Sequence, residues 1–357
     1  METKLLDVTD LEHAGEKLAY AGSVLRAGGL VAFPTETVYG LGGDALNPNA
    51  AADIYKAKGR PSDNPLIVHI SEISGLEQLA GRVTDKAEKL MEAFWPGPLT
   101  MIFEKSGEVP LATTGGLPTV AVRMPDHPVT LALIREAGCP LAGPSANLSG
   151  RPSPTRWEHV YEDLSGRIDA ILQAEPCRVG IESTVLDMTE DTPAILRPGI
   201  ITPEMIRDKI GGKVVYDPAL FVNRPRDVSA GGTPGGRADG SLLEQTDGPA
   251  PKAPGMKYRH YAPRAEMILY QGGAAAVRQA ALKRKAAEEA AGRSVGLLLF
   301  EGEDARLVAR EFFAELRKMD ASGVDIILAA ALDTSDPVGF SVMNRMLKSA
   351  GYRVEQV

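Results

Sequence analysis

The chain has 357 residues, and at about 150 residues per domain this length predicts two domains. Hydrophobic residues make up 44% and charged residues 24% of the chain, which is a globular composition and excludes a largely disordered protein. The formal net charge of −8 argues against a surface that binds nucleic acid over its whole extent, although a local basic patch and weak RNA binding stay open.

The first part of the chain alternates between helical and extended patterns. In residues 11–26 the apolar Leu18, Ala21 and Leu25 recur at helical spacing, and Gly28 follows where a helix ends. Further helices are expected at residues 50–58, 85–94, 130–137 and 202–210. Strands are expected at residues 30–33, 66–70, 99–103, 120–123, 140–142, 170–173, 183–187 and 194–196. This order predicts one mixed α/β domain over residues 1–216.

The composition changes at residue 217, where glycine and proline interrupt all periodicity. Residues 217–262 are therefore expected to form a flexible linker. Beyond it, strands at 267–270, 295–300 and 324–329 alternate with helices at 274–291, 304–318 and 340–349. This alternation predicts a small parallel, Rossmann-like α/β domain over residues 263–357. Its helices have mixed charge and it lacks a phosphate-binding fingerprint, so we expect a regulatory or architectural role.

Cysteine content and the N-terminus bear on the compartment. Cys139 and Cys177 are too few and too far apart for a disulfide framework or a zinc site, which favours a reducing compartment. The first residues lack a signal-peptide pattern, and no apolar run approaches the ~18 residues of a membrane span. We therefore expect a cytoplasmic protein without a membrane partner.

Polar motifs follow the predicted strands, at the edge where α/β sheets bind ligands. The first, PTETVYGLG at residues 34–42, combines hydroxyls, a carboxylate and glycines, and it is also what a structural turn would contain. Its spacing from Gly40 to Ala45 imitates a dinucleotide fingerprint but lies too far past the strand to be one. The motif therefore favours a ligand loop without proving it.

Cations occur in the second motif, KGRPSDNPL at residues 58–66. Lys58 and Gly59 also fit an ordinary helix C-terminus, so either a phosphate clamp or a helix cap explains this segment. His69, at the end of the next strand, is more often a core residue than a ligand-binding one.

Three later segments place polar groups next to apolar strands. Arg123 ends an apolar run, and a buried guanidinium requires a partner or an anion. Serine, asparagine and arginine are dense at residues 143–155, and Glu182 and Arg197 lie at further strand boundaries. The chain shows neither a Walker loop nor a nucleophile elbow. This inventory predicts a pocket for a nucleotide-sized anion, with catalysis by positioning and charge stabilisation.

The ordered motifs together resemble the threonylcarbamoyl-AMP synthase family, also called the Sua5/YrdC family. The resemblance rests on the runs PTETVYGLG, KGRPSDNPL, FWPGPLT, TVAVRMP, GPSANLSGRPSPT, ESTV and LRPG, in this order over about residues 20–200. APGMKYRHYAP at residues 253–263 is similar to the hinge motif of the branch that has an extra C-terminal domain. The family implies a YrdC-like twisted mixed sheet, followed by a linker and the small second domain.

The resemblance also implies an activity and a set of site residues. Family members are nucleotidyltransferases that join L-threonine, bicarbonate and ATP, with Mg²⁺, into L-threonylcarbamoyladenylate and pyrophosphate. A tRNA threonylcarbamoyl transferase receives the product for N6-threonylcarbamoyladenosine at position 37 of tRNA. By resemblance, threonine and its carbamate would contact Thr37, His69, Arg123, Gly143 and Ser183. ATP would contact Arg60, Asn64, Thr119, Ser145, Asn147, Ser153 and Arg197. Lys58 and Arg60 would be catalytic, Tyr258 and Tyr261 would belong to a lid, and no residue is assigned as a metal ligand.

Two other functions compete with this interpretation. The carbamoyl-transfer domain of hydrogenase-maturation proteins shares the fold, but those chains are much longer and contain zinc-finger cysteines, which this sequence lacks. An RNA-binding or ribosome-maturation module is the other alternative, and the acidic balance of the chain argues against it. Without the resemblance, the residues alone indicate an α/β domain with an anion pocket.

Overall fold

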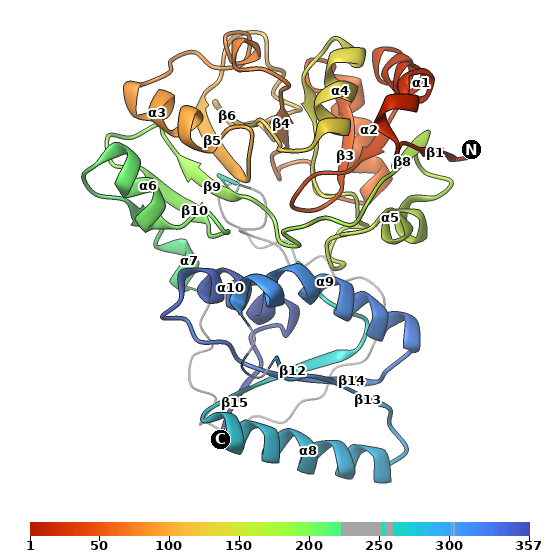
Figure 1. Ribbon diagram of the computed structural model, residues 1–357, viewed down its shortest axis with the longest axis vertical. Helices are drawn as coiled ribbons and strands as arrows, with labels where there is room; N and C mark the ends of the chain where they lie inside the picture. The colour runs from red at the N-terminus through yellow and green to blue at the C-terminus, as the bar shows by residue number, and fades with distance from the viewer. Residues whose placement is uncertain (223–251, 254–259, 301, 303) are drawn as a thin grey trace.

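Two bodies, each built on its own sheet, make up the structure in Figure 1. It is a computed structural model and describes residues 1–222, 252–253, 260–300, 302 and 304–357. The expected Tyr258 and most of the expected linker, residues 217–262, lie outside this description. The domain boundaries at residues 216 and 262 stay a prediction. Among the described residues, no helix is long and apolar enough to cross a membrane.

The N-terminal body contains an eleven-stranded sheet of order β1-β8-β2-β3-β7-β4-β6-β5-β9-β10-β11. Its strands are β1 (Lys4–Asp7), β2 (Val31–Phe33), β3 (Gly40–Asp44), β4 (Ile67–His69), β5 (Leu99–Glu104), β6 (Thr119–Arg123), β7 (Leu141–Ala142), β8 (Ala170–Gln173), β9 (Thr184–Asp187), β10 (Ala194–Arg197) and β11 (Val215–Tyr216). The sheet combines parallel pairs, such as β4 with β6, and antiparallel pairs, such as β5 with β6. The predicted mixed sheet is confirmed.

Helices cover this sheet at the places where the sequence predicts them, with two additions. They are α1 (Gly15–Arg26), α2 (Pro48–Lys58), α3 (Asp85–Phe94), α4 (Pro128–Ala137), α5 (Trp157–Leu164), α6 (Pro203–Ile210) and α7 (Ala219–Val222), with short 3-10 turns η1 (Leu11–His13) and η2 (Ile73–Leu76). The Asn47 side chain caps α2, and Gly59 ends it with φ of 62°. The helix therefore stops where the second cationic motif begins. The sequence did not predict α5 and α7.

The glycine-rich segment of the first motif is a strand, which corrects the expectation of a loop. A Cβ at Gly40 would lie 2.6 Å from the Phe33 ring on the neighbouring strand β2, and a Cβ at Gly42 would lie 3.0 Å from it. Glycine is required there because the aromatic ring occupies the space that a side chain would take. The glycines of the motif therefore pack the sheet and place Thr35 and Thr37 in the turn before it.

The C-terminal body has a sheet of order β13-β14-β12-β15, and every pair in it is parallel. Its strands are β12 (Glu266–Gln271), β13 (Val295–Leu298), β14 (Ile326–Ala330) and β15 (Val354–Gln356), and its helices are α8 (Ala274–Ala290), α9 (Ala305–Ser322) and α10 (Pro337–Ser349). The predicted parallel sheet is confirmed, and β15 is a strand that the sequence analysis missed. Helix α8 covers the outer face, whereas α9 and α10 lie between this sheet and the N-terminal body (Figure 1).

One apolar cluster spans the boundary between the two bodies. Val38 and Ile181 of the N-terminal body pack in the same cluster as Phe312 and Phe313 of α9. Gly180 lies so close to α9 that a Cβ there would be 2.4 Å from the Cα of Arg310. The start of the expected linker is also packed, because Phe221 of α7 lies 6.2 Å from the Phe340 ring of α10. The C-terminal body thus lies directly behind the loops that follow the large sheet.

Candidate active site

A pocket opens among the loops that follow β2, β4, β6 and β7, and residues near β10 complete it. It encloses about 700 Å³, including the space open to solvent. Its lining is rich in hydroxyls and cations and consists of Thr35, Thr37, Val38, Tyr39, Gly40, Lys58, Arg60, Ile67, His69, Arg123, Gly143, Pro144, Ser145, Asn147, Ser149, Gly150, Arg151, Glu182, Ser183, Arg197, His260 and Tyr261. Hydroxyls and cations together suit an anionic ligand.

At one end of the pocket, Arg123 is held in a fixed orientation. Its Nη2 lies 2.6 Å from Glu36 Oε2, its Nη1 donates to Thr37 Oγ1 at 2.9 Å, and its Nε donates to the Gly97 carbonyl at 3.1 Å. Thr35 braces Thr37, since their hydroxyl oxygens lie 2.9 Å apart. Both members of the ion pair are buried. The turn before β3 and the end of β6 therefore form one rigid polar wall.

His69, at the end of β4, faces the same end of the pocket. Burial, with the neighbouring Arg123 guanidinium, lowers the pKa of His69 to about 3, so the imidazole is neutral at pH 7. Its ring packs edge-on against Phe33 at 5.4 Å, and its Nδ1 has no hydrogen-bond partner among the described residues. A Cβ at Gly143 would lie 2.9 Å from this Nδ1, so glycine avoids a clash with the buried nitrogen.

The loop after β7 is tied to the end of α2 by a lysine. Lys58 Nζ donates to the carbonyls of Ser145 and Asn147, the latter at 2.5 Å. Ser145 Oγ donates to Asn147 Oδ1 at 2.6 Å, and Asn147 Nδ2 donates to the Arg151 carbonyl at 3.0 Å. Burial and the nearby Arg60 lower the pKa of Lys58 well below its usual value. Lys58 thus positions the loop as well as lining the pocket.

Arg60 follows Gly59 and reaches back along the second motif. Its Nε donates to the Asn64 carbonyl at 3.3 Å and its Nη2 to the Pro65 carbonyl at 3.1 Å. The Tyr55 hydroxyl donates to the same Asn64 carbonyl at 3.2 Å. These bonds hold a cation at the pocket wall, where a phosphate would be attracted.

Arg197 and Ser183 form a buried pair on the other side. Arg197 donates from Nε to the Ser183 carbonyl and from Nη2 to Ser183 Oγ, both at 3.0 Å. Thr100 Oγ1 lies 2.7 Å from Ser183 Oγ. Burial lowers the pKa of Arg197, although the group remains a cation at neutral pH. After Arg123 and Arg60, Arg197 is therefore a third guanidinium held in a fixed position at the site.

Glu182 joins this side to the C-terminal body. Its Oε1 accepts from Ser153 Oγ at 2.5 Å, and its Oε2 accepts from Arg345 Nε of α10 at 3.1 Å. Burial alone would raise the pKa of Glu182, but Arg345, Arg197 and the Ser153 hydroxyl bring it below the usual range. Glu182 is therefore ionised at neutral pH and links both bodies at the pocket.

Residues from the hinge motif close the pocket. Tyr261 and His260 line it, and the Ala262 N–H donates to the Gly150 carbonyl at 2.8 Å. The Tyr261 ring packs 5.2 Å from Phe313 of α9. Tyr261 therefore lines the pocket, whereas Tyr258 lies outside the described residues. The assignment of both tyrosines to a lid stays a prediction.

Of the fourteen described residues that the sequence analysis singled out, eleven line this pocket. The other three do not line it. Asn64 is buried behind Arg60, and Ser153 donates to Glu182 behind the wall. Thr119 begins β6, at the opposite end of that strand from Arg123. The ligand roles of all fourteen stay predictions.

Sequence reasoning did not include several pocket residues among the candidates. Thr35 and Tyr39 belong to the first motif and could have been found by extending it. Glu182 precedes Ser183, and His260 precedes Tyr261, so each neighbours a residue that was singled out. Arg345 is different, because it lies 163 residues from Glu182 and no local signal connects them.

Comparison with known proteins bears directly on this site. A family model described as "Telomere recombination" matches residues 23–199, and one described as "Threonylcarbamoyl-AMP synthase, C-terminal domain" matches residues 201–351. The threonylcarbamoyl-AMP synthase of Pyrococcus abyssi is 44% identical over 351 residues, which cover 96% of each chain. That of Bacillus subtilis is also 44% identical and covers 99% of each chain.

A solved structure agrees over the same length. P. abyssi Sua5 complexed with L-threonine has a TM-score of 0.87 and 42% sequence identity, over 99% of this chain and 100% of that one. Fold, length and sequence thus agree across both bodies. The chain belongs to the threonylcarbamoyl-AMP synthase family.

Proposed function

We propose that this pocket converts L-threonine, bicarbonate and ATP into L-threonylcarbamoyladenylate and pyrophosphate. The observation that carries the proposal is the joining of two polar ends in one pocket. One end contains Arg123, Thr37 and His69, and the other contains Lys58 and Arg60. Family membership and the L-threonine complex of the P. abyssi protein support it.

The Arg123 end suits an amino acid with a hydroxyl side chain. The guanidinium attracts the carboxylate, and its position is fixed by Glu36 on the side away from the pocket. Thr37 and Thr35 offer hydroxyls to a polar side chain. His69 stays neutral at pH 7, so it does not repel an amine that must lose its proton before it can react.

The reaction needs charge stabilisation rather than a covalent nucleophile. The threonine amine and bicarbonate combine to a carbamate with loss of water. A carbamate oxygen then attacks the α-phosphorus of ATP, a new P–O bond forms, and the bond to the pyrophosphate oxygen breaks. Negative charge develops on the phosphate oxygens and on pyrophosphate, where Arg60 and Arg197 supply compensating charge and Lys58 holds the neighbouring loop in place.

The pocket fits a magnesium ion that arrives on the triphosphate. Its two nearby carboxylates, Glu36 and Glu182, already pair with Arg123 and Arg345. Mg²⁺ at such sites is bound mainly by phosphate oxygens and water, and it adds positive charge to the transferring phosphoryl group when present. Ser145 on the pocket wall offers a further oxygen.

The product determines the place of the reaction in the cell. Threonylcarbamoyladenylate is a mixed anhydride that hydrolyses readily, so a transferase must accept it soon after release. In the family this transferase modifies adenosine 37 of tRNA. We propose that the present protein passes its product to such a transferase in the cytoplasm. Weak RNA binding by this chain would be compatible with it, although the net charge of −8 does not favour it.

Radiolabelled bicarbonate tests the proposal. Purified protein is incubated with Mg²⁺, ATP and L-threonine, and label in the nucleotide product is measured together with pyrophosphate. L-serine and a reaction without amino acid are the controls. We expect label and pyrophosphate in equal amounts and only with threonine. Folded protein that binds ATP without either product would refute the proposal, and binding of RNA without ATP would then favour the RNA-binding alternative.

A further inference from the structure

We propose that Arg317 of α9, in the C-terminal body, is a positioning residue for the nucleotide side of the pocket. It acts through Asp163 and holds the segment at residues 145–153, several of whose residues line the pocket. The proposal rests on the function proposed above. It assigns to the second body a direct part in ATP binding, in place of the regulatory or architectural role that the sequence indicates.

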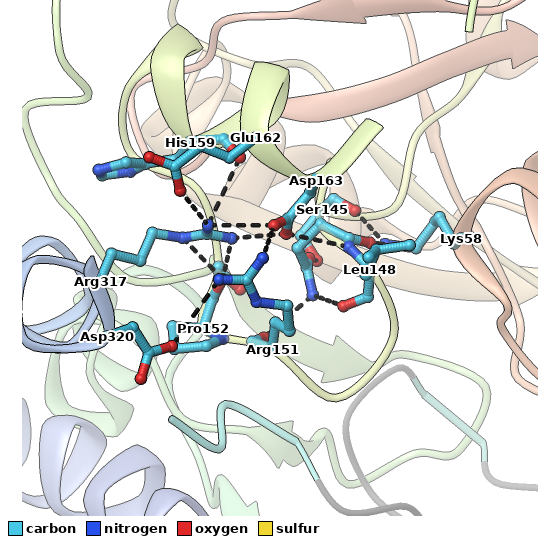
Figure 2. A network of polar contacts seen from close by, with 12 residues as sticks. Lys58, Ser145, Leu148, Arg151, Pro152, His159, Glu162, Asp163, Arg317 and Asp320 are labelled. Atoms are coloured by element: carbon cyan, nitrogen blue, oxygen red, sulfur yellow. Dashed lines mark hydrogen bonds and ion pairs between the residues drawn. The ribbon is translucent and has the colours of Figure 1, made fainter. Parts of the chain in front are cut away.

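The Arg317 side chain crosses the boundary between the two bodies and is almost completely buried (Figure 2). Its Nε and Nη2 both donate to the Pro152 carbonyl, at 3.2 and 2.6 Å. Nη2 also donates to Asp163 Oδ2 at 2.8 Å. One guanidinium therefore donates hydrogen bonds to the loop backbone and to a carboxylate of α5 at the same time, which its planar set of donors makes possible.

Asp163 connects Arg317 to two further residues of the loop. Its side chain is fully buried, and its Oδ2 accepts from the Leu148 N–H at 3.1 Å. Its Oδ1 pairs with Nη1 of Arg151, whose Nη2 lies 3.8 Å from Asp320 Oδ2 of α9. The loop is thus fixed at three successive places, Leu148, Arg151 and Pro152, by groups that all depend on Asp163 or Arg317.

The opposite face of the same loop forms the pocket. Lys58 donates to the carbonyls of Ser145 and Asn147 from the α2 side. Figure 2 shows Lys58 beside Ser145. Asn147 and Ser149, which flank Leu148, line the pocket. The loop is therefore clamped between a lysine of the N-terminal body and an arginine of the C-terminal body.

Charge balance explains why the clamp depends on both bodies. Arg151 and Arg317 face Asp163 and Asp320, and all four groups are largely or fully buried. The exposed Glu162 lies 3.8 Å from Arg317. His159 adds no charge at pH 7, because burial and Arg317 lower its pKa to about 3. Removal of Arg317 would leave Asp163 with a single guanidinium partner and release the Pro152 carbonyl.

The consequence should be confined to the nucleotide. Thr37 lies in the turn before β3, His69 ends β4 and Arg123 ends β6. Arg123 donates to Thr37, and none of these three residues contacts the Arg317 network. Displacement of a binding loop by a fraction of an ångström weakens contacts made through that loop and leaves the distant wall in place.

The test compares Arg317→Met and Arg317→Lys with Lys318→Ala in the full-length protein. Lys318 is the adjacent residue on α9, and its side chain is 72% exposed and pairs with Glu315 at 3.5 Å. Pyrophosphate release gives kcat and the KM values of ATP and threonine. Calorimetric titration with ATP gives its Kd without catalysis. Thermal unfolding checks that each variant folds.

We expect Arg317→Met to raise the KM and Kd of ATP about tenfold or more, with kcat and the threonine KM within about twofold of wild type. Arg317→Lys should restore part of the ATP affinity, since an ammonium replaces the charge but not the fork. Lys318→Ala should match wild type.

Two results would overturn the positioning role. One is unchanged ATP affinity in folded Arg317→Met, or in Arg317→Lys if the methionine variant does not fold. The other is an equal loss of ATP and threonine affinity, which indicates general loosening of the fold. If wild type binds ATP but makes no threonylcarbamoyladenylate, the proposed function is wrong, and the ATP titration still decides the role of Arg317.

Discussion

Replacement of Arg345 by methionine should lower the free energy of unfolding more than the loss of an exposed arginine does, because Arg345 joins the two bodies. Arg345 has no exposed surface and donates to Glu182 Oε2 at 3.1 Å, to the Ser341 carbonyl at 3.0 Å and to the Pro198 carbonyl. Methionine fills similar space but leaves the buried Glu182 carboxylate without this partner. Breaking a buried ion pair in this way costs about 3–5 kcal/mol.

Arg353→Met is the matched control within the same body. Arg353 pairs with Glu266, but both side chains are 44% exposed to solvent. Exposed pairs of this kind contribute about 0.2–1 kcal/mol. The two variants thus remove the same charge and the same kind of partner, and they differ in burial.

Urea unfolding followed by circular dichroism measures the difference. With a slope of about 3 kcal/mol per molar urea, a loss of about 3–5 kcal/mol lowers the midpoint by about 1–1.7 M. Arg353→Met should lower it by no more than about 0.3 M. Combining Arg345→Met with Glu182→Leu should recover stability, because an apolar pair replaces the ion pair without leaving a lone charge. Equal midpoints for the two single variants would refute the reasoning.

Three further predictions concern the site and the boundary between the bodies. Arg60→Ala should fold normally but reduce pyrophosphate release about 10²-fold or more, and an unchanged rate would remove Arg60 from the site. His69 has a folded pKa of about 3 and an unfolded value of 6.5, so the unfolded state binds the extra proton and wild type loses stability as pH falls below 6.5. Between pH 7 and pH 5 this loss is about 2 kcal/mol. Over the same pH range, the urea midpoint of His69→Gln should therefore fall less than that of wild type. An equal fall in the two proteins would contradict this. Gly180→Ala should cost more than about 2 kcal/mol in urea unfolding, because its φ is 82° and the added Cβ would lie 2.4 Å from α9 backbone. Gly116→Ala, with φ of 86° and no atom within 4 Å of the Cβ, measures the backbone strain alone, and an equal loss in both would exclude a steric contribution from α9.

Local patterns were sufficient to find most of the pocket. His69 and Arg123 stand at the ends of apolar strands, and the Thr37 turn follows another. Strands β4 and β6 are parallel, so their carboxyl ends bring His69 and Arg123 to the same edge of the sheet. Strand β2 runs in the opposite direction, since β2, β3, β7 and β4 pair antiparallel in turn, so the local patterns identified the Thr37 turn without predicting how it meets His69 and Arg123.

Strand β3 shows where local patterns mislead. The sequence GLGGD has the composition of a loop, since glycine is unfavourable in strands. Here the Phe33 ring of β2 covers the glycines and takes the place of their missing side chains. A propensity argument considers one segment at a time, so it cannot include packing by a side chain from the neighbouring strand.

The buried arginines of α9 and α10 are the clearest case of information that periodicity lacks. On a helical pattern Arg317 and Arg345 read as solvated charges, and the mixed charge of these helices indicated a separate structural module. In the structure both guanidiniums point into the N-terminal body. Arg317 pairs with Asp163, which lies 154 residues away in the sequence, and Arg345 pairs with Glu182, which lies 163 residues away. A buried cation is stable only beside its partner, so each of these pairs fixes the orientation of one body on the other. The pocket loops are built into the same pairs, and the site therefore needs both bodies to reach its final geometry.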